Sequence, residues 1–248
     1  MRFNQRFPYN MTRSALPSSA SVIVGGGSGN RFGGDKLTVL LAGKPLIAHT
    51  LSAFEGTAAV SAIVLVVPPG REEEFRTIAS IEGISKLTSV IPGGEHRHES
   101  VRRGLEALSP EVELVAIHDA ARPLITPDLI TSCLEMAAQE GASALTVPVT
   151  DTLHRIDASG CAAGTVDRTT LRAMQTPQVF CAAEIRDLLA AVSGNPTDEV
   201  SVAVAAGKKV SLVEHHEPNL KVTWPHDVVM AEALLRARGG KRERQNEK

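Results

Sequence analysis

Aromatic residues are scarce in this chain of 248 residues: they amount to 3%, with one Trp, one Tyr and six Phe. Because hydrophobic residues still make up 43%, we expect a core built from Ala, Val, Leu and Ile. No apolar run approaches the roughly 18 residues that a membrane span needs, which excludes a membrane-spanning protein. The charges nearly balance, with 26 basic and 28 acidic residues, which excludes a protein that binds nucleic acid with its whole surface.

Cysteine is rare as well. Cys133, Cys161 and Cys181 are widely spaced and form no Cys-x-x-Cys pair, which excludes a disulfide framework and favours a reducing compartment. Residues 1–20 lack the apolar segment of a secretory signal, so we expect a cytoplasmic protein. The same residues hold three Arg and no acidic residue, which leaves targeting to an organelle as the alternative to a disordered lead.

The rest of the chain predicts a single domain over residues 21–238 and a charged, disordered tail over 239–248. Apolar segments typical of buried strands alternate with helical segments; the strands are expected at 21–27, 59–69, 88–92, 113–120, 142–151, 176–180 and 208–216. This alternation predicts an α/β fold with a mostly parallel sheet and helices on both faces. The last helix is expected to end at the glycine pair Gly239–Gly240.

Residues 152–175 interrupt this alternation, with turn-like glycines and few apolar residues. The segment predicts a β-hairpin arm inserted into the α/β body. Such an arm has too little core of its own to be stable without a neighbour.

A glycine-rich loop over residues 24–36 follows the first strand. It lacks the third glycine of the dinucleotide-binding fingerprint, and Asp35 stands where a P-loop has its Lys. What remains is a glycine loop with two cations, Arg31 and Lys36. Glycines let backbone N–H groups approach phosphate oxygens, so the loop favours an anionic, polyphosphate ligand over a turn with two solvated charges.

Polar residues also follow the strand expected at 88–92. Gly93 and Gly94 expose backbone groups, and Glu95 and Ser100 offer side-chain hydrogen bonds. The alternative is a simple turn from strand to helix. Because ligands bind at the carboxyl ends of strands in open α/β sheets, a second wall of the same site is expected here.

Asp119 and Arg122 follow the strand at 113–120, where a carboxylate and a cation suit a metal–phosphate site. The alternative is an Asp–Arg ion pair that ends the strand. Further on, Thr197 could cap a helix and contact a ligand, and Lys221 lies just before the last helix.

Taken in order, the motifs of the chain resemble one family. These are GGGSGNRF with Lys36, then GGEHRHESV, HDAARP, PVTDT, TVDR, TPQVF, TDE and NLKVTWPHD. Their order is similar to that in the 2-C-methyl-D-erythritol 4-phosphate cytidylyltransferases, over about residues 20–236. The resemblance implies a Rossmann-like nucleotidyltransferase fold and a homodimer interlocked through its hairpin arms. It also implies transfer of CMP from CTP to methylerythritol phosphate, with Mg²⁺.

The resemblance also implies roles for individual residues. It assigns catalysis to Arg31, Lys36 and Lys221, and metal binding to Asp119. Nucleotide-binding residues are Gly25, Gly26, Gly27, Ser28, Gly29, Gly93, Gly94, Glu95 and Ser100. Residues for the acceptor substrate are Ala120, Arg122 and Thr197, with Thr152 and Arg168 from the partner's arm.

The chain departs from the family pattern at several positions. The family loop usually reads Pro-Ala-Ala-Gly where this chain has Val24-Gly25-Gly26-Gly27, Asp35 replaces a Pro, and Trp224 replaces a polar or basic residue. The extra glycines are similar to those of ribitol-5-phosphate cytidylyltransferases, which remain an alternative. A non-catalytic nucleotide-binding module is the alternative from another class, and retention of four charged residues that contact phosphate or metal argues against it.

Overall fold

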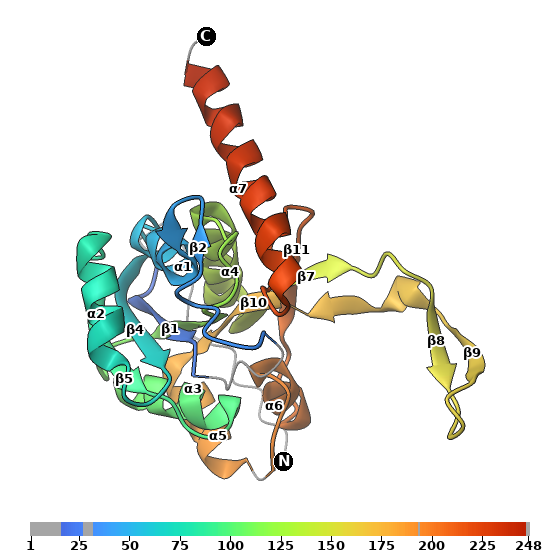
Figure 1. Cartoon of the computed structure of the whole chain (residues 1–248). Helices are drawn as coiled ribbons and strands as arrows, with labels where there is room; N and C mark the ends of the chain where they lie inside the picture. Colours follow the sequence, from blue (N-terminus) through green and yellow to red (C-terminus); the bar gives the residue numbers. More distant parts are fainter. Residues whose placement is uncertain (1–15, 27–31, 193, 247–248) are drawn as a thin grey trace.

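The structure, a computed structural model, describes residues 16–26, 32–192 and 194–246. A central sheet of seven strands has the order β11-β7-β10-β6-β1-β4-β5 (Figure 1). Its strands are β1 (Ser19–Val24), β4 (Val60–Val67), β5 (Leu87–Pro92), β6 (Leu114–Asp119), β7 (Ala142–Pro148), β10 (Arg172–Cys181) and β11 (Ser211–Glu214). Pairings in the sheet are parallel except those of β10, which runs antiparallel to both β6 and β7. The expected mostly parallel sheet is confirmed.

Helices cover both faces of this sheet. They are α1 (Leu46–Glu55), α2 (Glu72–Ile81), α3 (Arg97–Glu106), α4 (Pro127–Glu140), α5 (Ala182–Ala191), α6 (Glu199–Ala205) and α7 (Pro225–Asn246). Side chains of β1 alternate between two buried clusters: Ile23 packs with residues of α1, α2 and α4, and Val22 packs with residues of α3, α5 and α6. This alternation is why the strand is buried along its whole length. Among the described residues, no helix is long and apolar enough to span a membrane.

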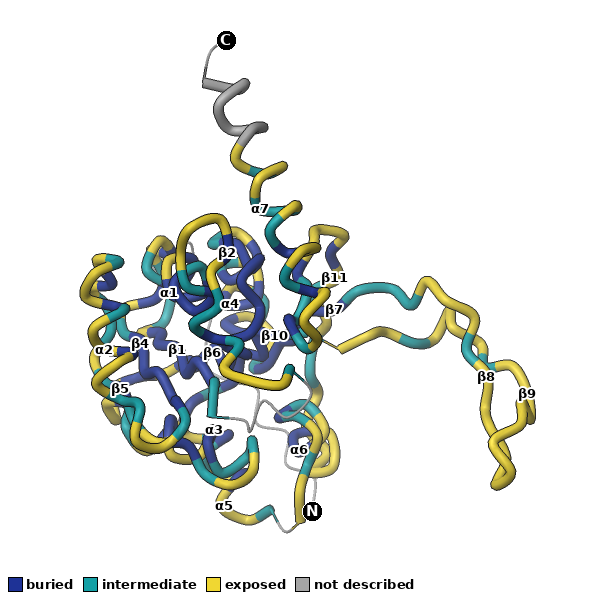
Figure 2. The backbone as a smooth tube through the Cα atoms, in the orientation of Figure 1, coloured by how far each residue is buried: buried dark blue, intermediate teal, exposed yellow. Residues whose placement is uncertain are grey.

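The expected arm is present. Strands β8 (Leu153–Ile156) and β9 (Ala162–Val166) form an antiparallel hairpin, followed by a short 3₁₀ helix, η1 (Arg168–Thr170). The hairpin projects from the body and is almost entirely exposed (Figure 2). A second small hairpin, β2 (Leu40–Leu41) and β3 (Lys44–Pro45), was not predicted; its turn has positive φ angles at Ala42 and Gly43.

The ends of the domain differ from the sequence prediction. Strand β1 already begins at Ser19, inside the segment expected to be a disordered lead. Helix α7 continues through Gly239 and Gly240 to Asn246, so the predicted helix end at this glycine pair is wrong. A glycine inside a helix costs only about 1 kcal/mol relative to Ala, which weakens a helix without ending it.

Candidate active site

The carboxyl ends of the central strands lie at one edge of the sheet because the strands are in parallel register. Val24 at the end of β1 pairs with Asp119 at the end of β6. The main chain continues this pairing: Gly25 N donates to Val66 O at 2.7 Å, and Gly93 N donates to Val67 O at 2.8 Å. The segments that follow three strands therefore lie side by side, as the sequence predicts.

A first cavity of about 640 Å³ opens at this edge. Its walls are formed by the glycine loop, the segment after β4 and the segment after β5. The lining residues are Gly25, Gly26, Gly34, Asp35, Lys36, Leu37, Pro68, Pro69, Arg71, Gly93, Gly94, Glu95 and Arg103. The structure thus brings six of the predicted site residues together around one cavity. Gly27, Ser28, Gly29 and Arg31 lie outside the described residues.

Glycines permit a close approach of two chain segments in this cavity. A Cβ on Gly93 would lie 2.9 Å from Ser100 Oγ and 3.1 Å from Gly26 Cα. The buried Ser100 holds the turn, since its hydroxyl accepts a hydrogen bond from Gly94 N at 3.0 Å and donates one to His96 O at 3.2 Å. Ser100 is therefore a supporting residue behind the cavity wall.

The glycine loop is tied to its surroundings at its C-terminal end. Asp35 accepts a hydrogen bond from Leu37 N at 3.1 Å and pairs with Arg71 Nη1 at 2.7 Å. Lys36 Nζ donates to Val222 O at 3.2 Å, which connects the loop to the segment before α7. The aspartate that replaces the family's proline thus forms an ion pair with the residue that precedes α2.

A second cavity, of about 590 Å³, is lined by Asp119. Its walls come from the end of β6, from residues 174–178 of β10, from the starts of α3 and α6, and from Lys221. The lining residues are Arg97, Asp119, Arg122, Met174, Gln175, Thr176, Gln178, Thr197, Asp198, Val200, Ser201, Val204 and Lys221. Four predicted residues, Asp119, Arg122, Thr197 and Lys221, meet here.

Asp119 is surrounded by cations. Its Oδ2 accepts from Lys221 Nζ at 2.7 Å, its Oδ1 accepts from Arg97 Nε at 3.1 Å, and Arg122 Nε lies 3.8 Å from Oδ2. Burial alone would raise the pKa of the Asp119 carboxyl, but Arg97, Lys221 and Arg122 together hold this pKa well below its usual range. The carboxylate is therefore ionised throughout the physiological pH range.

Comparison with known proteins decides the family. The family model for 2-C-methyl-D-erythritol 4-phosphate cytidylyltransferase matches residues 20–237. The chain belongs to this family. A relative with this name from Cereibacter sphaeroides is 43% identical over 227 residues, which is 90% of this chain and 99% of the relative. One from Pelotomaculum thermopropionicum is 38% identical over 228 residues, 90% of this chain and 96% of the relative.

Solved structures support the same assignment. The enzyme of this name from Thermus thermophilus is 32% identical, with a TM-score of 0.69 over 88% of this chain and 99% of that chain. A structure titled 4-diphosphocytidyl-2C-methyl-D-erythritol synthase from Anaerococcus prevotii is 23% identical, with a TM-score of 0.78 over 89% of this chain and 96% of that chain. This second likeness shows the shared fold, and the expected Rossmann-like nucleotidyltransferase architecture is confirmed.

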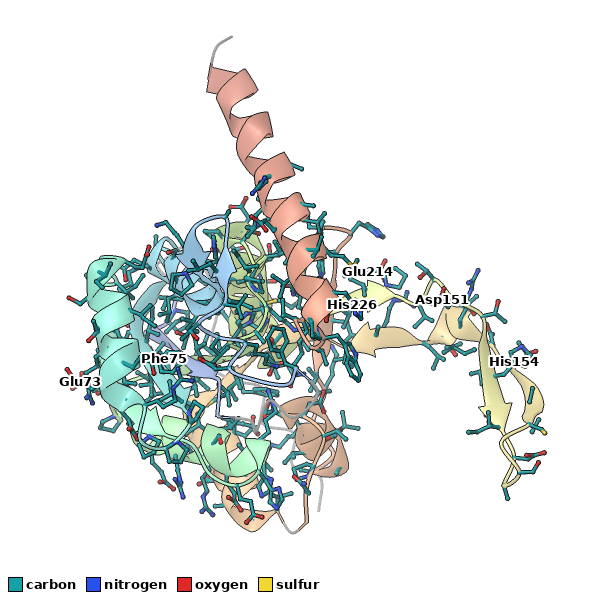
Figure 3. The ribbon with its side chains drawn as sticks, in the orientation of Figure 1. Glu73, Phe75, Asp151, His154, Glu214 and His226 are labelled. Carbon is teal, nitrogen blue, oxygen red and sulfur yellow. The ribbon has the colours of Figure 1, made fainter. Side chains whose placement is uncertain are left out.

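Besides Ser100, three described residues that the family resemblance selects lie outside both cavities. Ala120 is buried, with its N donating to Val24 O and its O accepting from Thr50 Oγ1, both at 2.9 Å. Thr152 and Arg168 belong to the arm, which extends away from the body of its own chain (Figure 1 and Figure 3). Arg168 Nη1 donates to Thr150 O, so the guanidinium is held against the base of the arm.

Helix α6 begins differently from the sequence prediction. The cap of the helix is Asp198, whose carboxylate accepts from Ser201 N at 2.9 Å, and Thr197 is left to line the second cavity. Arg122 is also anchored, because its Nη1 donates to Asn219 O at 2.8 Å.

Sequence reasoning did not select Arg97 or Glu199 as site residues. Arg97 Nη1 donates to both carboxylate oxygens of Glu199, at 2.6 and 2.9 Å, and this glutamate is almost completely buried. The sequence signals are weak: Arg97 is one of several charged residues in a polar helix start, and Glu199 is typical of a first helical turn. Nothing in the chain indicates that these residues, 102 positions apart, are partners.

The donor set at Asp119 fits a magnesium ion that arrives with a nucleotide. Within the described ranges, no group of three or more His, Cys, Asp or Glu side chains is placed to hold a metal on its own. Magnesium is commonly bound in proteins by one or two carboxylates, with the remaining ligands supplied by substrate phosphates and water. Asp119, an ionised carboxylate that lines the second cavity, meets that requirement.

Proposed function

We propose that this chain transfers CMP from CTP to 2-C-methyl-D-erythritol 4-phosphate, giving 4-diphosphocytidyl-2-C-methyl-D-erythritol and pyrophosphate. The observation that carries the proposal is the position of Asp119 and Lys221 in the wall of the second cavity, close to Lys36 of the first cavity. Lys36 donates to the carbonyl of Val222, the neighbour of Lys221, so two cations from distant segments of the chain are brought near each other. Family membership supports the same reaction.

The first cavity is assigned to CTP. The glycine loop with Gly26, Gly27, Ser28 and Gly29 would hold the triphosphate through backbone N–H groups, as glycine-rich loops do. Gly25, whose N–H is bonded to Val66 O, would contact the nucleotide as part of the cavity wall. Cytosine is assigned to the wall of Gly93, Gly94 and Glu95, which Ser100 supports from behind. Cytosine carries an exocyclic amine where uracil carries an acceptor, so backbone carbonyls in this wall can discriminate between them.

The second cavity is assigned to the acceptor, with Arg122 and Thr197 as contacts and Ala120 as a buried support for the wall. In the reaction, an oxygen of the acceptor phosphate attacks the α-phosphorus of CTP in line with the bond to the β-phosphate. The new P–O bond forms as the bond to pyrophosphate breaks. A phosphate monoester is already anionic near neutral pH, so no side-chain nucleophile is needed.

Charge neutralisation is the main task of the protein groups in this reaction. Lys36 and Arg31 are assigned to the α-phosphate, where negative charge develops in the transition state. Lys221 can reach the same phosphate when it releases Asp119. Asp119 would hold Mg²⁺, which supplies positive charge to the phosphate oxygens when it is bound.

The arm is assigned to a homodimer interface. An exposed hairpin of this size has little core of its own and would be marginal in isolation. Packing of two arms across a two-fold axis would bury both and would bring Thr152 and Arg168 to the acceptor site of the partner subunit.

The test is turnover with a panel of substrates. We expect pyrophosphate release from CTP with methylerythritol phosphate, and much slower release with ribitol 5-phosphate or with UTP in place of CTP. Preference for ribitol 5-phosphate would instead support the alternative that the extra glycines of the loop suggest. Tight CTP binding without turnover on any acceptor would identify a nucleotide-binding module.

A further inference from the structure

Glu199 is an unusually buried carboxylate beside the second cavity. Its side chain is 2% exposed, and both of its oxygens accept hydrogen bonds from the same nitrogen, Nη1 of Arg97. Helix α6 does not need Glu199 as a cap, because Asp198 already fills that position. Burial raises the pKa of the Glu199 carboxyl, and the Arg97 guanidinium opposes this rise. A buried ion pair contributes little net stability, since desolvation offsets its attraction, so stability alone does not explain this pair.

Arg97 connects Glu199 to the reaction centre. Its Nε donates to Asp119 Oδ1 at 3.1 Å, so one guanidinium joins carboxylates from α6 and from the end of β6. The Arg97 side chain is 25% exposed and lines the second cavity. Within the part of the chain that the structure describes, its third nitrogen, Nη2, has no hydrogen-bond partner. Two nitrogens thus fix the guanidinium, and one remains for a ligand.

The other cations of this cavity are held by fewer hydrogen bonds to described residues than Arg97 is. Arg122 donates through Nη1 to Asn219 O, and Lys221 donates to Asp119. The remaining carboxylate in the wall, Asp198, is held by Ser201 N and by Gln178 Nε2 at 3.0 Å. A guanidinium that is already fixed loses little side-chain entropy when it binds a phosphate, which makes Arg97 well suited to this ligand.

We propose that Arg97 contacts the phosphate of the acceptor polyol phosphate through Nη2, and that the buried Glu199 is the positioning residue that holds Arg97 for this contact. The inference rests on the proposed function in that it takes the second cavity as the acceptor site. It adds a substrate contact and its support from α6.

The experiment measures acceptor binding apart from turnover. The full-length protein is saturated with a CTP analogue that cannot be cleaved between the α- and β-phosphorus, and methylerythritol phosphate is titrated into it by calorimetry. The variants are Glu199→Gln, Arg97→Lys and the double variant. The control is Glu82→Gln, which neutralises another largely shielded glutamate, paired with Lys44 at 2.6 Å and remote from both cavities.

We expect Glu199→Gln to weaken acceptor binding about tenfold and Arg97→Lys to weaken it at least as much, because Lys lacks the planar fork. Affinity for the CTP analogue should change less than about twofold in both variants, since neither residue lines the first cavity. The double variant should bind the acceptor no worse than Arg97→Lys, because Glu199 acts through Arg97. The control should bind like the parent protein.

Two results would overturn the inference. Unchanged acceptor affinity in folded Arg97→Lys would remove Arg97 from the acceptor site. Equal losses for both ligands, with a lower Tm, would show that the pair serves only the fold. If Glu199→Gln fails to fold, Arg97→Lys alone still decides between these outcomes. Absence of turnover in the parent protein with acceptor binding intact would contradict the reaction and leave the assignment of Arg97 standing.

Discussion

A single methyl group at Gly93 should disturb the nucleotide cavity. The Cβ of Gly93→Ala would lie 2.9 Å from Ser100 Oγ, 3.1 Å from Gly26 Cα and 3.4 Å from Val67 O. Neither close neighbour can rotate away. Gly26 Cα is part of the main chain, and Ser100 Oγ is held by hydrogen bonds to Gly94 N and His96 O. The segments after β1 and β5 must therefore move apart by a few tenths of an ångström.

The cost of this movement can be bounded. Overpacking a well-packed site by one methyl group typically costs about 1–3 kcal/mol. Alanine also lowers the conformational entropy of the unfolded chain, which offsets about 0.4–1 kcal/mol of this loss. We expect a net loss of about 1–2 kcal/mol in the free energy of unfolding. A matched control is Gly34→Ala in the same cavity, where an added Cβ meets nothing within 4 Å; its stability should be unchanged or higher by up to about 1 kcal/mol, because only the effect on the unfolded chain applies.

Urea unfolding measures the free energies, and steady-state kinetics measures the KM for CTP. We expect Gly93→Ala to raise this KM as well, because the displaced segment forms the predicted cytosine wall. A Gly93→Ala protein as stable as the parent, with the same KM for CTP, would refute the claim that the close approach of Gly26 and Gly93 shapes the cavity.

Four further predictions follow from the site and the core. Lys36→Ala should lower kcat about 100-fold or more by removing a transition-state charge, and near-normal kcat in the folded variant would contradict its role. Asp119→Asn should raise the Mg²⁺ concentration needed for half-maximal activity; equal activity of the parent protein with and without added metal would show the metal assignment to be wrong. Mixing Arg168→Ala with Lys36→Ala under subunit exchange should restore up to about a quarter of parent activity, because mixed dimers hold one intact site; no recovery despite heterodimers would exclude action in the partner's site. Burial lowers the pKa of His118 from 6.5 to about 3, so only the unfolded chain binds its proton as pH falls through this range. Stability should therefore fall towards acid, and His118→Gln should lessen that loss by about 1.4 kcal/mol per pH unit in urea titrations; parallel pH profiles would contradict this.

Most of the fold follows from local sequence patterns. Apolar runs such as 113–120 predict buried strands because both faces of the sheet are covered by helices. The end of α7 did not follow, since two glycines are too weak a signal to stop a helix that is otherwise favourable. The antiparallel direction of β10 also has no local signal, because it depends on the return path of the arm.

The site could be predicted only in part. Residues that follow strands, such as Lys36, Gly93 and Asp119, were found because parallel strands bring their carboxyl ends to one edge. Arg97 and Glu199 could not be found in this way, because their pairing depends on how the tertiary fold brings the starts of α3 and α6 together. The same holds for Asp35 and Arg71, which meet through the packing of α2.

Phosphorus NMR of the purified chain with CTP, methylerythritol phosphate and Mg²⁺ tests the central claim most directly. The account predicts that the triphosphate signals are replaced by those of pyrophosphate and by the two coupled signals of a diphosphate diester. Unchanged spectra, or formation of CMP and pyrophosphate without the diester, would contradict transfer to this acceptor.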